Sequence, residues 1–409
     1  GYRTFMDNVQ PLVDAVKQSD DGFYRMEKSF HRKTNDSMAL GFYGLSNSSS
    51  TLNEAVIKFL EQMGYASKSH WSKYLGGTPV SDSLLGIKYL LLDEPTNQYL
   101  YQMTAYDDEN NYRTYYNPYA LSIAYAVSNN LMSLDAESYD SPMALMNALV
   151  TLMLGEEQTV ELFKPVPVAD EQTHNINMSY ATGHRRYAAS VEGMEAKLTY
   201  TLMPENKYEI FCYFPTDTKR EVTLYVNGID EGTVYGSDTD RIISLGTMTP
   251  GEPVEVSLKL KEDVFYVKTN ATSFWYLDIE VFRDAFTRLA QGNVTFTSHT
   301  DTHLEGTVNV PEGRTLLFTS IPYDEGWHIT ADGVELDLIK TADALLAVKL
   351  PAGEHKLVFD YMPDCVVYGR MISIAGLLAF AALATGEKIV RNRRDRRWAE
   401  SVSLYTPVM

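Results

Sequence analysis

Three residues near position 325 have side chains of the types that contact sugars in proteins. Tyr323, Asp324 and Trp327 lie close together in the sequence. The face of an aromatic ring packs against a pyranose ring, and a carboxylate accepts hydrogen bonds from sugar hydroxyls. The same spacing is typical of aromatic side chains that fill the core at the edge of a β-sandwich. We therefore predict a sugar contact here, with a purely structural role as the alternative.

A second candidate substrate-binding region lies nearer the amino terminus. Trp71 follows His70 in a predicted loop, where it is placed to contact a membrane bundle or a lipid headgroup. Ser48 and Ser49 belong to a run of three serines that lacks the Gly-x-Ser-x-Gly context of a nucleophile. No phosphate-binding Gly-x-x-x-x-Gly-Lys pattern occurs in the chain. These serines are expected to shape a helix entry, and a substrate-facing role stays open.

Other polar clusters favour neither metal binding nor hydrolysis. His299, Asp301 and His303 alternate along a predicted strand, so their side chains are expected on one face. Two imidazoles and a carboxylate are a reasonable metal set, but neighbours on one face lie ~6.5–7 Å apart, and this spacing rarely places three ligands on one ion. The acidic run 107–109 could supply one half of a glycosidase carboxylate pair, but a charged run before two asparagines is usually a solvated turn. We predict no metal site and no catalytic residue in this chain.

The elements that position these residues fall into three folded regions. Residues 1–165 mix helical and strand patterns, including helices over 5–18 and from the Thr51–Glu54 capping box to Met63. Pro11 fits the first helix only if that helix starts late or kinks. Residues 166–283 and 284–363 show short alternating runs typical of antiparallel strands. The predicted fold class is α+β multidomain, an α/β domain followed by two β-sandwich domains, the first jelly-roll-like, and a transmembrane helix.

The two β-rich regions resemble each other. Asn227-Gly228 and Asp332-Gly333 are both hairpin signals, and each is followed by a Pro-, Gly- and Glu-containing turn and then a strand. Two sister sandwiches explain this pattern. Convergent turn chemistry explains it equally well, because such dipeptides suit hairpins in any fold.

A hydrophobic segment near the carboxyl end predicts membrane attachment. Residues 371–386 carry no charge and are followed at once by a basic cluster. We predict a transmembrane helix over 366–390 and a basic cytoplasmic tail over 391–409, by the positive-inside rule. A buried core helix is the alternative. The body is expected to be extracytoplasmic, and the start Gly1-Tyr2-Arg3, without a signal sequence, is that expected of a fragment.

Charge and cysteine content exclude further classes of function. The 409 residues include 54 acidic and 35 basic side chains, a formal net charge of -19. Removing the six basic residues and one acidic residue of 388–397 leaves 53 acidic and 29 basic side chains in the rest of the chain. Such a body is not expected to bind nucleic acid. Cys212 and Cys365 do not make a disulfide framework, although a single bridge between them stays open.

The order of several short motifs resembles the bacterial YfhO family of multispanning membrane proteins. In the first half these motifs are Phe23-Tyr24-Arg25-Met26-Glu27, Asn35-Asp36, Gly44-Leu45-Ser46 with the serines at 48–50, and the runs 84–89 and 116–121. In the second half they are the run 321–327, Asp332-Gly333, the run 351–355 and the final hydrophobic segment. The resemblance covers nearly the whole chain.

The resemblance implies a GT-C-like membrane glycosyltransferase in a bacterial cell membrane. Such a protein would use a polyprenyl-phosphate sugar donor and decorate cell-envelope glycopolymers of the teichoic acid class. The catalytic carboxylate would lie in an outer loop of an amino-terminal membrane bundle that these residues lack, so this part would bind the acceptor or serve as a scaffold without a cofactor of its own. The alternative is a membrane-anchored carbohydrate-binding or adhesion module without catalysis, and a glycoside hydrolase is a third reading.

Overall fold

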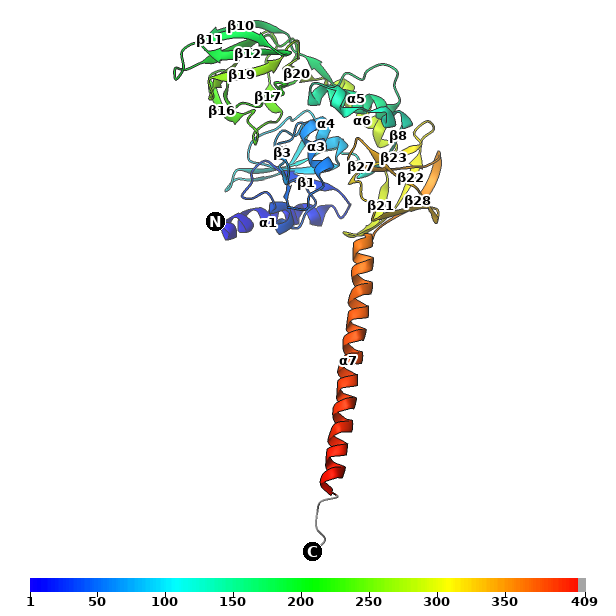
Figure 1. The fold of residues 1–409 in the computed structure, drawn as a ribbon. Coiled ribbons are helices and arrows are strands. Elements are labelled where there is room, and N and C mark those ends of the chain that lie inside the picture. The colour runs from blue at the N-terminus through cyan, green and yellow to red at the C-terminus, as the bar shows by residue number, and fades with distance from the viewer. Residues whose placement is uncertain (404–409) are drawn as a thin grey trace.

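One long helix projects from a body built of three β-rich units (Figure 1). The computed structural model describes residues 1–403. The predicted fold class is confirmed: an α/β domain comes first, two antiparallel β-sandwiches follow, and an apolar helix ends the described chain.

The α/β domain is built on a mixed sheet with the strand order β1-β5-β7-β6. Only β1 and β5 in it run parallel. Helix α1 covers one face, where Val9, Val13 and Val16 pack near Met26 and Leu91. The other face meets the main core of the body. The elements are α1 (Tyr2–Ser19), β1 (Arg25–Lys28), α2 (Asp36–Leu40), β2 (Asn47–Ser48), α3 (Glu54–Gln62), β3 (Ser67–Lys68), β4 (Trp71–Ser72), α4 (Pro79–Leu84), β5 (Ile87–Leu92), β6 (Gln102–Asp107) and β7 (Tyr112–Tyr116).

The predicted helix over 5–18 is confirmed as α1, which runs from Tyr2 to Ser19 and contains Pro11, so the helix does not start late. Because proline has no N–H, only one main-chain hydrogen bond is lost there. Helix α3 is capped by Asn53, whose side chain accepts a hydrogen bond of 3.0 Å from the Ala55 amide, so the predicted box at Thr51 is not used.

The first sandwich combines a five-stranded sheet, β10-β13-β18-β15-β16, with sheets of three and four strands. The predicted strands 197–202 and 254–260 are confirmed at their exact bounds. The elements are β9 (Phe163–Pro165), β10 (Val168–His174), β11 (Ile176–Ala181), β12 (His184–Ala189), β13 (Lys197–Leu202), β14 (Glu209–Cys212), β15 (Val222–Val226), β16 (Ile229–Val234), β17 (Ile243–Thr247), β18 (Val254–Leu260), β19 (Val264–Lys268) and β20 (Phe274–Leu277).

The second sandwich pairs a five-stranded sheet, β21-β22-β28-β24-β25, with the sheet β26-β27-β23-β8. Strand β8 comes from the first 165 residues of the chain but pairs with β23, so the α/β domain and this sandwich are joined through a shared sheet. The elements are β8 (Ala124–Val127), β21 (Thr295–His299), β22 (His303–Val310), β23 (Leu316–Pro322), β24 (Trp327–Ala331), β25 (Val334–Glu335), β26 (Leu338–Thr341), β27 (Leu345–Lys349) and β28 (Gly353–Tyr361).

The five-stranded sheets of the two sandwiches share one strand order. In each sheet, the two strands that come first in the chain lie side by side, and the strand that comes last in the chain lies next to the second of them. The two strands of the hairpin complete the far edge. The hairpins at Asn227-Gly228 and Asp332-Gly333 are confirmed. Asn227 and Asp332 also make equivalent bonds, since each side-chain Oδ1 accepts 2.9 Å from the amide of a residue at the start of the last strand, Glu255 or Lys356. This agreement in topology favours sister sandwiches over convergent turns.

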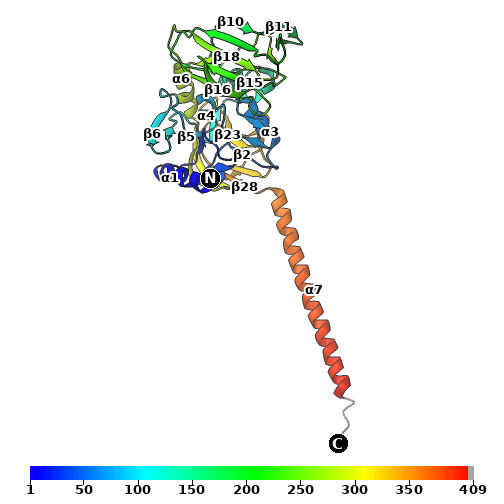
Figure 2. The ribbon, with the colours of Figure 1, turned by 90° about the vertical axis from the view of Figure 1, so that its left-hand side faces the viewer.

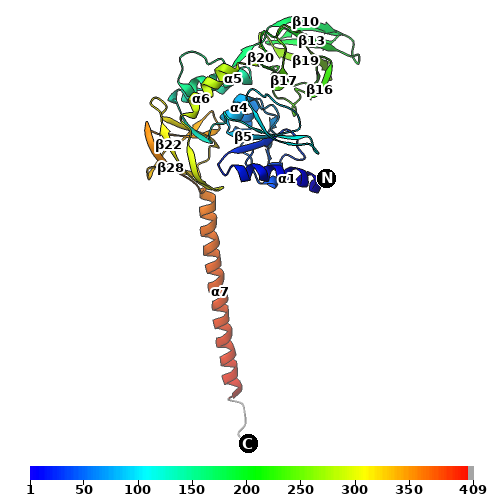
Figure 3. The same cartoon turned by 180° about the vertical axis from the view of Figure 1, so that it is seen from behind.

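Two helices fill the junction between the units. Helices α5 (Pro142–Leu154) and α6 (Ile279–Ala290) contact each other and lie between the two sandwiches in Figure 3. Helix α5 is buried on nearly every side, and Leu149 and Phe282 belong to a core that also includes Leu316 of the second sandwich. Short 3-10 helices at Asn129–Ser133 and Ala136–Ser138 precede α5. The units therefore share one core.

Helix α7 (Asp364–Ser403) leaves the end of β28 as a single straight element. The predicted span 366–390 lies within it, and its apolar side chains are exposed, with Ile372 at 72% and Phe380 at 72%. This is the one helix in residues 1–403 that is long and apolar enough to cross a membrane. Figure 2 shows α1 and the start of α7 at the same face of the body. The last residues of the predicted tail, 404–409, lie outside the described residues.

The possible bridge between the two cysteines is not formed. Cys212 is buried in the first sandwich and Cys365 is exposed on α7, and both are free thiols. Burial raises the pKa of the Cys212 thiol to about 12. Cys365 is therefore the reactive thiol of this pair.

Candidate functional site: a groove at the face where α7 leaves

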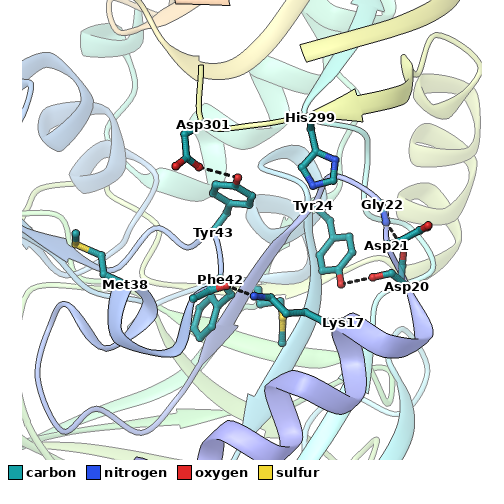
Figure 4. Close-up of a pocket in the computed structure, with 12 residues that line it drawn as sticks. Lys17, Asp20, Asp21, Gly22, Tyr24, Met38, Phe42, Tyr43, His299 and Asp301 are labelled. Atoms are coloured by element: carbon teal, nitrogen blue, oxygen red, sulfur yellow. Dashed lines mark hydrogen bonds between the residues drawn. The ribbon is translucent and has the colours of Figure 1, made fainter. Parts of the chain in front are cut away.

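A groove lies between the α/β domain and the second sandwich (Figure 4), near α1 and β21, which lie on the side of the body from which α7 leaves. Its volume is about 600 Å³. We call it the basal groove. Its lining comprises the end of α1, the loop before β1, the segment after α2, and the turn between β21 and β22; the side chains that matter below are Lys17, Asp20, Asp21, Tyr24, Met38, Tyr43, His299 and Asp301.

Asp20 is the most constrained carboxylate of the basal groove. Its Oδ2 lies 2.5 Å from Lys88 Nζ and accepts a hydrogen bond of 3.0 Å from the Tyr89 hydroxyl. Its Oδ1 accepts 3.0 Å from the Gly22 amide. Burial alone would raise the pKa of Asp20, but these bonds, led by the one from Lys88, lower it overall. Asp20 is therefore a fixed negative charge at the wall of the groove.

Two tyrosines supply hydroxyl groups to the same groove. Tyr24 donates 2.9 Å to the Asp20 carbonyl oxygen, and burial together with Asp20 and Asp21 raises its pKa to about 12. Tyr43 donates 2.9 Å to Asp301 Oδ1 from the opposite wall, and its pKa is raised by burial and by that bond. Both phenols are protonated at neutral pH and act as hydrogen-bond donors.

An aromatic cluster supports the wall formed by the second sandwich. The ring of Phe23 stacks on His299, with 5.1 Å between centroids, and meets Tyr43 edge-on at 5.3 Å and Phe296 at 5.3 Å. These contacts cross from the α/β domain to β21. The groove is thus held open by packed rings rather than by loops alone.

The predicted arrangement of His299, Asp301 and His303 on one strand face is wrong. His299 ends β21, Asp301 lies in the turn, and His303 begins β22. Their partners differ, since His303 Nδ1 lies 2.6 Å from Asp360 while Asp301 accepts from Tyr43. Within residues 1–403, no group of three or more His, Cys, Asp and Glu side chains is placed to hold a metal ion.

The basal groove continues toward the predicted serines. An adjoining cavity of about 270 Å³ shares Tyr24, Met38 and Tyr43 with it and reaches Asn47 and Ile321. Asn47 precedes Ser48 in β2, and Ile321 lies two residues before Tyr323. Two of the predicted clusters therefore lie next to the far end of the groove.

Ser48 and Trp71 lie in the small sheet β2-β4-β3, and Ser49 follows β2, where its amide donates 3.1 Å to the His70 carbonyl. Ser48 pairs with Trp71 across that sheet, and Asn35 bonds both the amide (2.6 Å) and the carbonyl (2.9 Å) of Ser48. The Ser49 hydroxyl lies 3.0 Å from that of Thr51, and Lys73 Nζ lies 5.0 Å from the centre of the Trp71 ring. A substrate contact for these residues stays a prediction.

Tyr323, Asp324 and Trp327 form the turn that holds the start of α7. Asp324 Oδ1 accepts 2.8 Å from the Gly326 amide, and the Gly326 carbonyl accepts 2.8 Å from Met362. The Trp327 ring packs on Tyr361, with centroids 4.9 Å apart, beside the core of the second sandwich. The Tyr323 carbonyl accepts 3.4 Å from Asn53. Sugar binding by this turn stays a prediction next to its structural role.

Sequence reasoning missed most of the basal groove. As a local pattern, Asp20-Asp21-Gly22 indicates only the end of a helix, and Tyr43 belongs to no motif. Asp301 stood out, but as a potential metal ligand. The groove exists because residues near 20 and 43 lie beside residues near 300, and no local pattern signals that contact.

One comparison with known proteins identifies a family. The sequence matches, over residues 1–373, the family described as bacterial membrane protein YfhO. Comparison with curated proteins gives no match.

Solved structures resemble parts of the chain only weakly. A mycobacterial arabinofuranosyltransferase, AftD, is 14% identical over 44% of this chain and 14% of its own, with a TM-score of 0.19. A conserved protein of unknown function from Pseudomonas aeruginosa is 10% identical over 49% and 93%, with a TM-score of 0.15. A β-glucuronidase from Ruminococcus gnavus is 11% identical over 41% and 33%, with a TM-score of 0.15. The chain thus spans about one seventh of the length of AftD.

Proposed function

This chain belongs to the YfhO family of bacterial membrane proteins, and we propose that its body binds the acceptor for a membrane glycosyltransferase of which α7 is one membrane span. The donor is a polyprenyl-phosphate sugar, and the acceptor is a cell-envelope glycopolymer of the teichoic acid class. Membrane segments outside these 409 residues supply the catalytic carboxylate. The body positions the acceptor and contributes no catalytic residue.

The observation that carries this proposal is the place of the basal groove. The end of α1 and the turn between β21 and β22 line it (Figure 4), and Figure 1 shows α1 and β21 on the side of the body from which α7 leaves. A polyprenyl-phosphate donor is held in the bilayer by its lipid chain, so its sugar can react only near the membrane surface. An acceptor bound in the basal groove lies at that surface.

The lining of the groove suits a hydroxyl-rich ligand. Asp21 and Asp301 present carboxylate oxygens that accept hydrogen bonds from hydroxyls. Tyr24 and Tyr43 add polar phenol groups beside these carboxylates. Lys17 is the one cation of the lining among the described residues, and it bonds the Gly41 carbonyl. Because the wall of the groove is acidic, the phosphate groups of the polymer are expected to lie outside it. Cations from the solution screen them there.

Charge segregation supports an extracytoplasmic body. The basic cluster that begins at Lys388 follows directly after the apolar part of α7, while the body is strongly acidic. By the positive-inside rule, the basic end faces the cytoplasm and the body faces the cell envelope. Acceptor polymers and the sugar moiety of the donor meet on that outer side.

The proposal is tested by sugar transfer in cells. The full-length protein, with the natural membrane segments, is expressed in a host that lacks its own copy, and the sugar content of purified teichoic acid is measured. Asp301→Asn weakens the hydrogen bond from Tyr43 and removes a charge from the groove. It is expected to lower the sugar content of the teichoic acid by about fivefold to tenfold. Asp108→Asn, an exposed carboxylate in the β6–β7 turn, is the matched control and is expected to leave it unchanged. An equal sugar content of the teichoic acid in both variants would contradict acceptor binding in the groove. If the unaltered protein binds the polymer but transfers no sugar, the non-catalytic binding module is favoured instead.

A further inference from the structure

A second polar cavity lies between the α/β domain and the first sandwich, away from α1. Its volume is about 690 Å³, within the range of pockets that hold small-molecule ligands. We call it the interdomain cleft. Its walls are α4, the end of β5, the loop 93–101, and strands β14, β16 and β17; the residues used below are Asp82, Glu94, Asn97, Tyr99, Glu209 and Glu231.

The base of the interdomain cleft is preorganised by buried polar groups. Asn97 and Glu209 are 5% and 8% exposed, and the Asn97 amide donates 2.9 Å to Glu209 Oε2 across the two units. The Ser244 hydroxyl donates 2.6 Å to Glu209 Oε1. Under the loop, Asp82 Oδ2 accepts from Tyr74 at 2.8 Å and from Tyr101 at 2.6 Å. The cleft therefore has fixed walls in which polar groups already have their directions set.

One aromatic ring of the interdomain cleft, that of Tyr99, is partly exposed and has a lysine as its cation partner. Tyr74 and Tyr101 are buried, with their hydroxyls bonded to Asp82. Tyr99 is 37% exposed, and Lys207 Nζ lies 4.9 Å from the centre of its ring. Its main-chain carbonyl accepts 2.9 Å from Arg283, which fixes the loop that carries it. An anchored, partly exposed tyrosine is a platform for a sugar ring.

The charge of the lining restricts the ligand. Among the described residues that line the cleft, Asp82, Asp93, Glu94, Glu209 and Glu231 are acidic, and none is Lys, Arg or His. Three cations contact lining residues from outside the lining: Lys207 lies by the Tyr99 ring, Arg283 donates to the Tyr99 carbonyl, and Arg113 donates 3.0 Å to the Asp93 carbonyl. A polyanion is therefore repelled, whereas neutral hydroxyl groups find several acceptors.

We propose that the interdomain cleft binds an uncharged oligosaccharide, with one sugar ring stacked on Tyr99 and its hydroxyls donating to Glu94 and Glu231. This binding does not depend on the transfer reaction proposed above. It would give the body two sites of different selectivity: the basal groove near the membrane, and a neutral-glycan site on the far side of the α/β domain. The interdomain cleft would tether the protein to uncharged glycans of the wall or capsule.

The test measures binding to the full-length protein in detergent micelles by calorimetry. The probes are maltotriose, cellotriose and triacetylchitotriose as neutral trisaccharides, and poly(glycerol phosphate) as the anionic polymer. At least one neutral trisaccharide is expected to bind, and Tyr99→Ala is expected to weaken it by about tenfold. Glu94→Ala, at an exposed position, is a second variant that leaves the core intact and is expected to weaken binding by about threefold.

Two controls separate this site from others. Tyr180→Ala removes a tyrosine that is 69% exposed on β11 and is expected to leave binding unchanged. Asp301→Asn in the basal groove is expected to leave it unchanged as well, so that failure of the acceptor proposal and failure of this one are distinguishable. The proposal is overturned if no neutral trisaccharide binds, if Tyr99→Ala and Glu94→Ala bind as tightly as the unaltered protein, or if poly(glycerol phosphate) binds and is lost in Tyr99→Ala.

Discussion

The hydroxyl of Tyr43 donates a hydrogen bond of 2.9 Å to Asp301 Oδ1, joining the α/β domain to the turn between β21 and β22. These residues lie 258 positions apart in the chain. Their contact sets the width of the basal groove, because each comes from an opposite wall.

Removing only this hydrogen bond is expected to weaken acceptor binding. Tyr43→Phe keeps the ring contact with Phe23 and deletes the donor to Asp301. We expect the apparent KM for the acceptor polymer to rise by about threefold to tenfold while kcat changes little, because the groove binds and does not catalyse. Steady-state transfer kinetics of membranes that contain the full-length protein measure both constants. Tyr180→Phe is the control, and a fall in kcat at constant KM would contradict the assignment.

The buried guanidinium of Arg25 is expected to hold the two walls together. It donates to the Leu85 carbonyl at 2.6 Å and to the Ser320 hydroxyl and carbonyl at 2.6 and 2.9 Å. Burial lowers its pKa to about 10, so it stays charged at neutral pH. Arg25→Met leaves buried acceptors without donors and is expected to lower the free energy of unfolding by about 3 kcal/mol.

Thermal and denaturant unfolding of the detergent-solubilised protein measure the effect of the Arg25 variant. Arg3→Met, at an exposed position of α1, is the matched control and is expected to change the free energy of unfolding by less than about 0.5 kcal/mol. If both variants unfold at the same denaturant concentration, Arg25 does not join the domains in the way described.

Asp82 is expected to make stability depend on pH. Burial raises its pKa from 3.8 to about 7, against the opposing effect of the bonds from Tyr101 and Tyr74. Between these values the unfolded chain ionises while the folded protein keeps the proton, so this contribution to stability is complete below pH 4 and is lost as pH rises to about 7. Asp82→Asn has no such proton. The free energy of unfolding of the unaltered protein, minus that of Asp82→Asn, should therefore fall between pH 4 and 7 and be flat above. A difference that rises with pH would refute the assignment.

Gly326 is expected to fix the direction in which α7 leaves the body. A Cβ at this position would lie 2.8 Å from Pro363 Cα and 2.9 Å from its nitrogen, so Gly326→Ala must displace the start of α7. A nitroxide on Cys365 reports this, since Cys365 is exposed and Cys212 is buried. We expect greater mobility of the label in Gly326→Ala. Gly376→Ala, where nothing lies within 4 Å, is the control. Equal spectra would show that the turn does not constrain the helix.

Local patterns predicted much of the sandwich structure. The Asn227-Gly228 and Asp332-Gly333 hairpins follow from residues that tolerate positive φ, which is 49° and 81° in the first turn and 53° and 81° in the second. The apolar run of α7 is equally local, because length and charge alone define it.

Contacts between distant segments could not be predicted in this way. The pairing of β8 with β23 joins Val127 to Leu316, and nothing in either strand specifies its partner. The basal groove depends on a similar contact between Tyr43 and Asp301. Asp82 was not noticed, because a buried carboxylate is recognisable only when the tyrosines that surround it, from positions 65, 74 and 101, are known. The substrate contacts predicted for Ser48, Trp71 and Trp327 stay predictions.

The most direct test of the account is whether the acceptor polymer occupies the basal groove. A photoreactive benzoylphenylalanine replaces Met38, which is 72% exposed and lines the groove, in cells that make the full-length protein and its polymer. The control replaces Met132, which is 46% exposed outside the groove. After irradiation, the account predicts a covalent adduct of protein and teichoic acid at position 38 and little at position 132. Adducts of equal yield at the two positions, or at position 132 alone, would contradict it.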